Sequence, residues 1–258
     1  MLGELLDAVA IGPRGCEGDR RWIVVDARTR ERIANKRGPT DPRLHACRAE
    51  LLDDRDEHPP LRITLPDGSA LEGAEIEAAL SELLGRRVRL ERCDAPADGC
   101  FGTTGAYHDL APIHLVTTAT LAHLRAVAPD CDWDMRRFRP NLLLDDPGDA
   151  SFAEDELLGA TLRAPSGLEL TVGLPTPRCV VPTRAQDGLP ADPAILRTLV
   201  ERHRIDLGPF GRHGCAGAYA EVASAGRVRT GERLDVRPGH TTPRAVIDDV
   251  VTRLRGRA

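Results

Sequence analysis

The sequence has few aromatic residues, which make up 3% of its 258 positions. Proteins that hold single-stranded nucleic acid stack its bases on aromatic side chains, so this low content argues against that class. Positive charge is not concentrated either, because the formal net charge is −5 and residues of both signs are mixed along the chain. With neither stacking platforms nor a basic strip, we expect no nucleic acid partner.

Long apolar runs are also missing from the sequence. No run approaches the roughly 18 residues that a membrane-spanning helix needs. The first ten residues, MLGELLDAVA, lack the basic start and the long apolar stretch of a signal peptide. We therefore expect a cytoplasmic protein with no membrane partner.

Cysteines are present, but not in the spacings of metal or redox motifs. None of the seven forms a CxxC pair, which argues against a zinc ribbon, a thioredoxin-like motif and an iron–sulfur cluster. A disulfide framework is not expected in the cytoplasm. We expect most of these cysteines to be small buried residues. They are Cys16, Cys47, Cys93, Cys100, Cys131, Cys179 and Cys215.

The standard catalytic motifs are absent as well. The sequence has no GxGxxG opening a helix, no Walker A lysine, no GxSxG elbow and no HExxH. A glycine-rich stretch at 208–217 lies before an expected strand, so it has little weight as a nucleotide cradle. Conventional hydrolase, nucleotide-binding and zinc functions are therefore not indicated.

The first hundred residues predict strands and turns with one helix. Apolar residues at helical spacing predict a helix over 73–85, with Gly85 suited to its C-cap. Strands are expected at 21–26 and 86–92, and a hairpin at 61–71 around Pro66-Asp67-Gly68. The segment 94–106, rich in Gly, Ala and Asp, is expected to be a flexible loop and a domain junction.

The second part of the chain alternates short strands with a few helices. Thr117 or Thr118 is suited to cap the helix that follows a strand at 112–117. A strand pair is expected around Pro165-Ser166-Gly167. Further expected elements are a buried strand at 141–145, helices at 192–206 and 243–256, and strands at 214–224 and 232–236. This pattern predicts an α+β, β-rich fold of β-barrels with helical cover.

Three arginine-bearing segments stand near strand ends or turns, at 35–43, 136–141 and 177–179. The third places Cys179 after Arg178 in a turn with prolines on both sides. Guanidinium groups bind phosphates and planar heterocycles, and a cysteine beside them is favoured as a thiolate that acts as a nucleophile or soft metal ligand. The residues alone leave two alternatives open: Cys179 is the reactive group of an anion-binding pocket, or it is a buried structural cysteine among solvated arginines.

Five segments in order carry a resemblance to a known family. They are DLAPIHLVTTATLAHL (109–124), RFRPNLLLD (137–145), FAEDELLGATLR (152–163), PTPRCVVPT (175–183) and GAYAEV (217–222). They resemble the MOSC family, named for the C-terminal domain of molybdenum cofactor sulfurase, and within it the bacterial proteins similar to the amidoxime-reducing component. The resemblance covers nearly the whole chain. It implies a smaller N-terminal β-barrel-like domain over 1–100, a MOSC β-barrel with helical cover over 101–240 and a C-terminal helix over 241–258.

The resemblance also implies roles for single residues. Cys179 matches the family's functional thiol, which is a molybdenum ligand in the amidoxime-reducing branch and a sulfur carrier in the sulfurase branch. Arg139 and Asn141 match residues that hold the pterin cofactor, and Arg178 belongs to the same Arg-Cys turn. Tyr219 matches a tyrosine near the cofactor.

Three further residues are implied with less specific motifs. Asp109 and Thr117 match positions that flank the pterin, and Asp109 is a candidate proton relay. Lys36 stands where relatives place a basic residue facing the cofactor phosphate. Two departures are visible: the family's Pro-Val-Lys-Ser segment has no counterpart, because MLGELLDAVA aligns just after it, and Pro182 replaces a threonine. We expect either a shortened start or a phosphate site that lacks this part.

The implied function is a molybdenum-cofactor oxidoreductase that reduces N-hydroxylated and related N–O compounds. Its partners would be a small-molecule substrate and a separate reductase or ferredoxin, since the sequence has no flavin or iron–sulfur motif. Two alternatives stay open: a sulfur-transfer protein that uses a Cys179 persulfide, and a non-catalytic domain that binds an anionic ligand.

Overall fold

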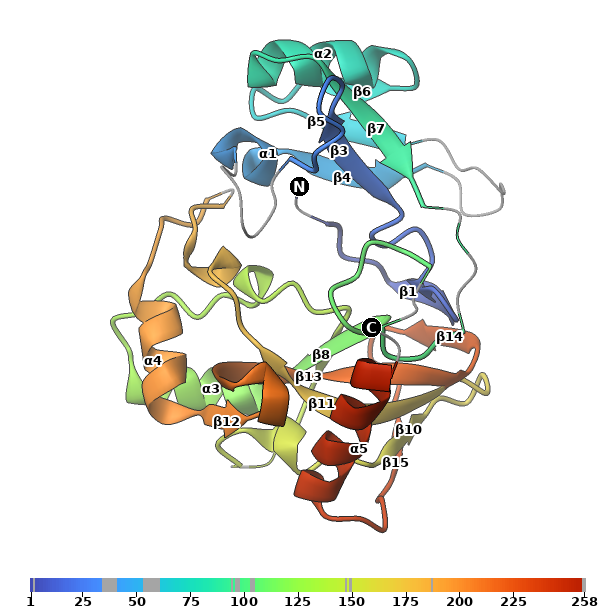
Figure 1. The fold of residues 1–258 in the computed structure, drawn as a ribbon, viewed down its shortest axis with the longest axis vertical. Helices are drawn as coiled ribbons and strands as arrows, with labels where there is room; N and C mark the ends of the chain where they lie inside the picture. Colours follow the sequence, from blue (N-terminus) through green and yellow to red (C-terminus); the bar gives the residue numbers. More distant parts are fainter. Residues whose placement is uncertain are drawn as a thin grey trace.

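The computed structural model describes residues 1, 3–33, 41–52, 61–93, 95, 98–102, 105–146, 148, 150–186 and 188–256. The molecule is elongated, with a small N-terminal unit above a larger, strand-rich unit (Figure 1). Across these described ranges, no helix combines the length and the apolar character needed to cross a bilayer. The expected Lys36 lies outside the described residues.

A curled sheet forms the centre of the larger unit. Its described strands are β8 (Ile113–Thr117), β9 (Leu142–Leu144), β10 (Thr161–Arg163), β11 (Glu169–Pro177), β12 (Arg204–Asp206), β13 (Arg212–Ser224) and β15 (Asp235–Arg237). Their order is β15-β10-β11-β13-β8-β9, and β12 pairs with β13 beside this path. Only the β8–β9 pair among these strands is parallel. The fold is therefore α+β and rich in strands, as predicted.

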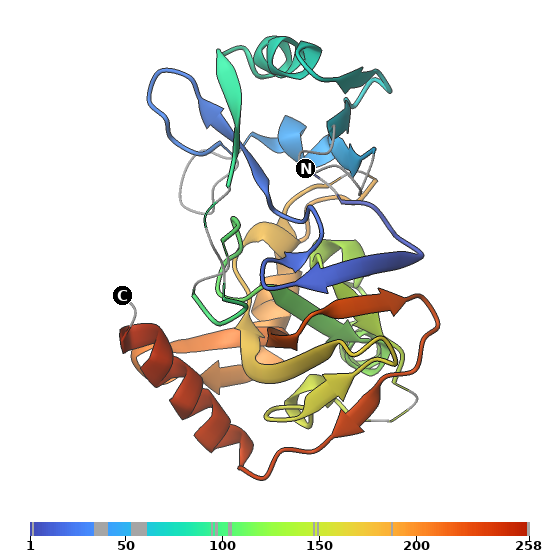
Figure 2. The same cartoon turned by 90° about the vertical axis from the view of Figure 1, so that its right-hand side faces the viewer.

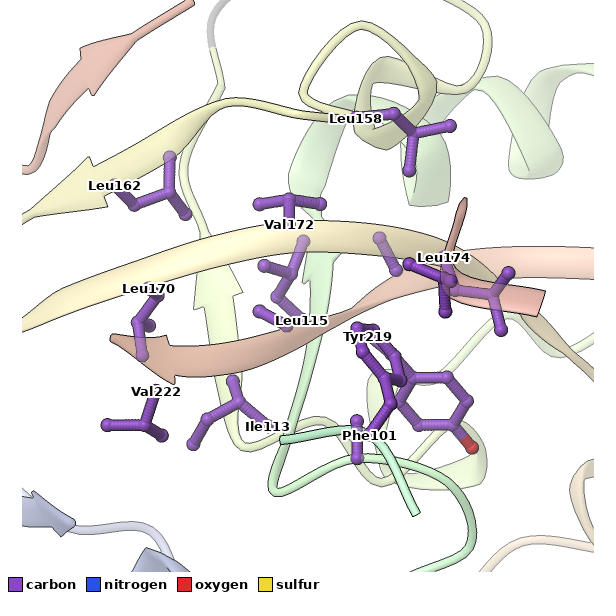
Figure 3. Packing of buried hydrophobic residues seen from close by; sticks show 14 of the residues in the cluster. Phe101, Ile113, Leu115, Leu158, Leu162, Leu170, Val172, Leu174, Tyr219 and Val222 are labelled. Atoms are coloured by element: carbon purple, nitrogen blue, oxygen red, sulfur yellow. The ribbon is translucent and has the colours of Figure 1, made fainter. Parts of the chain in front are cut away.

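One face of this sheet packs against the C-terminal helix, α5 (Pro243–Gly256). The helix buries Ile247, Val250, Val251 and Leu254, whose spacing places them on one stripe. They join the same cluster as Leu115 and Val172 of the sheet, the latter two drawn in Figure 3. Because successive strand residues point to opposite faces, β8 and β13 also supply a second cluster on the other side.

That second cluster lies under two helices, α3 (Thr118–Val127) and α4 (Ala194–Arg202). Val116 and Ala216 project from the sheet into it, next to Trp133 and Phe138. The rings of Trp133 and Phe138 are stacked with centroids 6.3 Å apart. This packing places Phe138, and the segment that follows it, beside the end of β8.

The first strands of the chain pair with one of its last. β1 (Ala8–Gly12) runs antiparallel to β14 (Gly226–Arg229) and to the short β2 (Gly15–Cys16), as Figure 2 shows for β1 and β14. Ile11 of β1 is a member of the core of the larger unit. Strand pairing thus crosses the boundary expected near residue 100, and the expected division into domains stays a prediction.

The remaining N-terminal residues form the upper unit. β3 (Trp22–Asp26) pairs with β7 (Val88–Arg92), and β4 (Arg48–Leu51), β5 (Leu61–Thr64) and β6 (Ala70–Glu72) form a second small sheet. The helices α1 (Pro42–Ala46) and α2 (Glu75–Leu84) complete this unit. The sequence predicted β3, the β5–β6 hairpin, α2 and β7, and the left-handed Gly85 that ends α2 (φ 64°) is also confirmed.

Two predicted elements differ from the structure. The strand expected to be buried at 141–145 is β9, and its middle residue Leu143 is 41% exposed because β9 lies at the sheet edge. The helix expected over 192–206 ends at Arg202, and the residues after His203 form β12 instead. They pair with the start of β13, a partner that local helical spacing does not reveal.

Gly217 is the position in β13 where the close packing of β8 demands a glycine. Its φ is +81°, and an added Cβ would lie 2.6 Å from both Leu115 O and His114 Nε2. We predict that Gly217→Ala lowers the free energy of unfolding by about 2 kcal/mol more than Gly167→Ala. Gly167 also has a positive φ (+92°) but has open space around it. Urea denaturation of both variants measures the difference, and equal losses would contradict the close contact.

Candidate functional site

Cys179 lies in a turn that leaves the sheet at the end of β11. The backbone N–H of Arg178 donates to Gly214 O of β13 at 2.9 Å, which fixes the start of the turn. The 3-10 helix η3 (Val181–Thr183) follows, and Thr183 Oγ1 donates to Val180 O at 2.7 Å. Cys179 is a half-buried free thiol. Its turn is therefore held on both sides while the thiol stays partly accessible.

Arg137 holds the chain that returns from this turn. Its side chain is fully buried, and its guanidinium donates to the carbonyl oxygens of Pro182 (3.2 Å), Arg184 (3.4 Å) and Pro190 (2.8 Å). It also forms an ion pair with Asp132 at 2.9 Å. Pro182, the departure from the family pattern, thus has a structural partner for its carbonyl. Arg137 therefore stabilises the conformation of the loop after Cys179, and we assign it no contact with a ligand.

Arg178 turns back over the 137–141 segment. Its Nη2 donates to Phe138 O at 3.0 Å and its Nη1 to His114 Nε2 at 3.2 Å, while the guanidinium lies 5.3 Å from the Phe138 ring centroid. Burial lowers the pKa of Arg178, and the ionisable side chains of Tyr219, Cys179 and Asp109 oppose this effect. Arg178 therefore joins the cysteine turn to β8 and to the Arg-Phe-Arg-Pro-Asn segment.

Arg139 approaches the same thiol from that segment. Its backbone adopts a left-handed conformation (φ 53°), which is uncommon for a residue with a side chain and marks local strain. Burial lowers the pKa of Arg139 to about 10, and the charges of Arg20 and Arg178 contribute in the same direction, whereas Cys179 opposes them. Arg20 and Arg178 thus repel Arg139, and Cys179 lies near enough to Arg139 and Arg178 to act on both.

Asn141 positions the third arginine. Its backbone N–H donates to His114 O (2.7 Å) and its Oδ1 accepts from His114 N (2.9 Å), so it continues the pairing of β8. Its Nδ2 donates to Asp19 Oδ2 at 2.7 Å, and the same oxygen accepts from Arg20 Nη1 at 2.8 Å. The Asn141 side chain is therefore engaged by the protein, and its expected contact with a cofactor stays a prediction.

Tyr219 and Asp109 interact electrostatically with Arg178 and Arg20. Tyr219 is 7% exposed, and burial, with a contribution from the charge of Asp109, raises the pKa of its hydroxyl to about 12. The Tyr219 ring lies 5.6 Å from that of His114. Asp109 is exposed, and its charge acts on Arg178, Arg20 and Tyr219. Tyr219 therefore stays protonated next to a solvent-facing carboxylate.

Thr117 is placed differently from the other expected residues. It is 1% exposed, its hydroxyl accepts from Thr120 N (3.1 Å) and so caps α3, and its backbone N–H donates to Glu154 Oε1 (2.6 Å). In the described part of the chain, these hydrogen bonds of Thr117 do not reach Cys179 or the arginines. The predicted helix cap is confirmed, while its role beside a cofactor stays a prediction.

The structure adds residues that sequence reasoning had not singled out. Asp19 and Arg20 come from the GDRRW segment, His114 from the middle of β8, and His45 from α1, where it reaches Arg139. Arg20 has a left-handed backbone (φ 51°), and its Nη2 lies 3.5 Å from Arg139 O. The Asp-Arg pair in the GDRRW segment was the available signal. Nothing in the local sequence indicates that His45 would lie near residue 139.

The fold and this geometry define a β-rich protein in which two arginines from distant segments, Arg139 and Arg178, interact electrostatically with one half-buried thiol. A family model for the MOSC domain matches residues 103–235, which is just over half of the chain. The chain belongs to the MOSC domain family, and this membership indicates a molybdenum-cofactor-binding or sulfur-related domain. Among curated proteins, no match to the chain was found.

Buried histidines around the site make stability depend on pH. Burial, followed by the charges of Arg178 and Arg20, lowers the pKa of His114 well below its usual value, and burial also lowers that of His45 and His108. Such groups are neutral when folded and protonate first in the unfolded chain. The free energy of unfolding should therefore fall as the pH drops below about 6.5.

The His114 contribution can be measured by urea denaturation at pH 6.5 and 5.5. We predict that His114→Gln reduces the pH slope by up to about 1.4 kcal/mol per unit, the effect of one proton. The exposed His240→Gln is the matched control and should leave the slope unchanged. Burial disfavours the charged form of His203, but the hydrogen bond and charge of Asp155 raise its pKa overall. His203 therefore stabilises the folded state at low pH, and this stabilisation is lost only as the pH rises above about 6.5. An unaltered slope in His114→Gln would contradict the prediction.

Proposed function

We propose that the protein binds the molybdenum cofactor and acts as an oxidoreductase that reduces N-hydroxylated and related N–O compounds. One observation carries the proposal: Arg139 and Arg178, from two separate segments, are both acted on by the half-buried thiol of Cys179, and Arg20 acts on both arginines. Membership of the MOSC family supports the same cofactor class. A soft thiolate is a suitable donor for molybdenum, and guanidinium groups suit a phosphate and a planar pterin.

The site has hydrogen-bond donors that fit such a ligand. The Nε atoms of Arg139 and Arg178 are buried, and among the described residues neither has a hydrogen-bond partner. A buried donor without a partner costs about 1–3 kcal/mol. Burial also lowers the pKa of both side chains, so their positive charge lacks full compensation in the protein. An anionic ligand rich in acceptor oxygens offsets both costs.

The residues divide into three roles in this proposal. Cys179 would supply the protein's ligand to the metal, and Arg139, Arg178 and Arg20 would hold the anionic and heterocyclic parts of the cofactor. When bound, the molybdenum centre supplies the two-electron chemistry that removes oxygen from an N–O bond. Lys36, Thr117 and Asn141 remain candidate cofactor-binding residues on the resemblance alone.

Proton supply falls to the exposed carboxylate. Reduction of an N–OH group consumes two protons and two electrons and releases one water molecule. Asp109 faces solvent and acts electrostatically on Tyr219 and Arg178, so it is placed to pass protons inward. Tyr219, whose pKa is raised to about 12, remains a hydrogen-bond donor at neutral pH. The electrons come from a separate reductase or ferredoxin, which we propose as the partner.

Cys179→Ser tests the metal ligand. We predict that molybdenum per chain, measured by mass spectrometry of metals in protein from a molybdenum-replete host, falls to background in this variant. Cys131→Ser is the matched control, because Cys131 is also a half-buried free thiol but lines a different pocket, with Arg125 and Trp133. It should retain the wild-type metal content.

The same pair of variants separates the two alternatives. If the wild-type protein holds no molybdenum and Cys179→Ser abolishes persulfide labelling, the chain is a sulfur-transfer protein. If Cys179→Ser changes neither quantity in a folded protein, the site binds an anionic ligand without using the thiol. Either outcome contradicts the proposed oxidoreductase.

Arg139→Ala tests the cofactor contact. We predict a loss of about 1.5–3 kcal/mol in binding, which is roughly ten- to hundredfold in affinity, because a charged donor is removed. The measurement is the pterin fluorescence released per chain after oxidation. Arg233→Ala, at an exposed position, is the control and should keep full pterin content. Equal pterin content in the two variants would contradict a contact between Arg139 and the cofactor.

A further inference from the structure

The buried residue His114 adjoins four of the residues that the family resemblance places at the cofactor. It lies on β8 and is 4% exposed. Its ring contacts Arg178 and Arg139, and its neighbour across the strand pair is Tyr219, whose ring centroid lies 5.6 Å away. Its backbone N–H and C=O both pair with Asn141. One side chain is therefore placed to hold several site residues relative to one another.

The contacts of the His114 ring determine which nitrogen carries its proton. Nε2 lies 3.2 Å from Arg178 Nη1, and a guanidinium group only donates, so Nε2 accepts. Nδ1 lies 3.5 Å from Arg139 O, which only accepts, so Nδ1 donates. Burial, followed by the charges of Arg178 and Arg20, lowers the pKa of His114 well below its usual value, although the carbonyl groups of Arg139 and Ala216 oppose this effect. A neutral ring with its proton on Nδ1 satisfies both contacts.

The facing strand leaves room for the ring only because it has a glycine there. A Cβ at Gly217 of β13 would lie 2.6 Å from His114 Nε2, the atom that accepts from Arg178. The backbone of His114 is fixed as well, since it pairs with Asn141 and lies opposite Tyr219 in the sheet. The ring therefore has a fixed position from which it can orient the guanidinium that it contacts.

We propose that His114 is a positioning residue of the candidate site, which orients the Arg178 guanidinium and the Arg139 backbone for the ligand. His114 itself needs no contact with that ligand. Residues that orient the groups touching a ligand matter in this way in metal sites, where their loss costs about ten- to hundredfold in affinity or activity. The identity of the ligand rests on the proposed function, whereas the positioning is a property of the protein alone.

The first experiment determines the tautomer of His114 in the unaltered protein. Nitrogen NMR of labelled protein separates a protonated from a bare ring nitrogen, and His114 is assigned through bonds to its own backbone. We expect a proton on Nδ1 and none on Nε2 at neutral pH, together with a slowly exchanging Nη1–H signal from Arg178. A ring that carries its proton on Nε2 overturns the proposal, because it could not accept from Arg178.

The second experiment compares the affinity of variants for the cofactor. The measurement is the pterin fluorescence released per chain after loading at graded cofactor concentrations. We expect His114→Leu, which can neither accept nor donate, to lower this affinity about ten- to hundredfold. His114→Gln, whose amide oxygen can accept from Arg178, should restore most of the affinity and keep the Arg178 Nη1–H signal.

His203→Leu is the matched control for the loss of a histidine that supports the fold. His203 is half-buried, and its ring nitrogens contact Asp155 Oδ2 at 2.8 Å and Cys215 O at 2.9 Å. This variant should lower the free energy of unfolding but keep the wild-type affinity for the cofactor. Equal losses of affinity in the two leucine variants, or no recovery in His114→Gln, would show that His114 supports only the fold and would overturn the proposal.

The two proposals fail separately. If the tautomer and the Arg178 signal are as expected but the wild type retains neither molybdenum nor pterin, the positioning role stands and the oxidoreductase falls. If molybdenum is retained through Cys179 while His114→Leu keeps full affinity for the cofactor, the function stands and the positioning role falls.

Discussion

The hydrogen bonds of one buried guanidinium, that of Arg178, bring the candidate site together. Its Nη2 donates to Phe138 O and its Nη1 to His114 Nε2. The backbone N–H of Arg178 donates to Gly214 O. These contacts join the cysteine turn, the 137–141 segment and the central strands β8 and β13. Cys179 follows directly in the chain, so these contacts, with those of Thr183 and Arg137 further along the turn, fix the position of the thiol. The rest of the site is arranged around it.

The site also concentrates positive charge where the protein supplies little compensation. Arg139 and Arg178 lose part of their affinity for the proton through burial, and Arg139 is repelled further by Arg20. Left-handed backbone at Arg20 and Arg139 adds local strain. Proteins accept such costs mainly where a ligand offsets them. By contrast, Arg137 is buried with an acid and three carbonyl groups, which is the pattern of a structural arginine.

The N-terminal residues belong to the site in two ways. Asp19 and Arg20 meet Asn141, and His45 meets Arg139, so both contacts reach the same short segment of the larger unit. The N-terminal strand β1 also pairs antiparallel with β14 of the larger unit. An anionic ligand at the arginines would therefore touch residues separated by more than a hundred positions in the chain. Residues of both units thus meet at the 137–141 segment.

The sequence by itself determined the local elements and the identity of the central groups. Helical spacing and Gly85 predicted α2, Thr117 was recognised as a cap, and the Arg-Cys turn and the Arg-Phe-Arg-Pro-Asn segment pointed to Cys179, Arg139 and Arg178. The helix and its cap are properties of residues close together in the chain, where spacing carries the information. The roles of Cys179, Arg139 and Arg178 came from the family resemblance and stay predictions. Only the tertiary structure decided which distant groups meet. The edge position of β9, the engagement of Asn141 by Asp19 and the approach of His45 to Arg139 all depend on contacts across 90 residues or more or on sheet order, which local patterns do not encode.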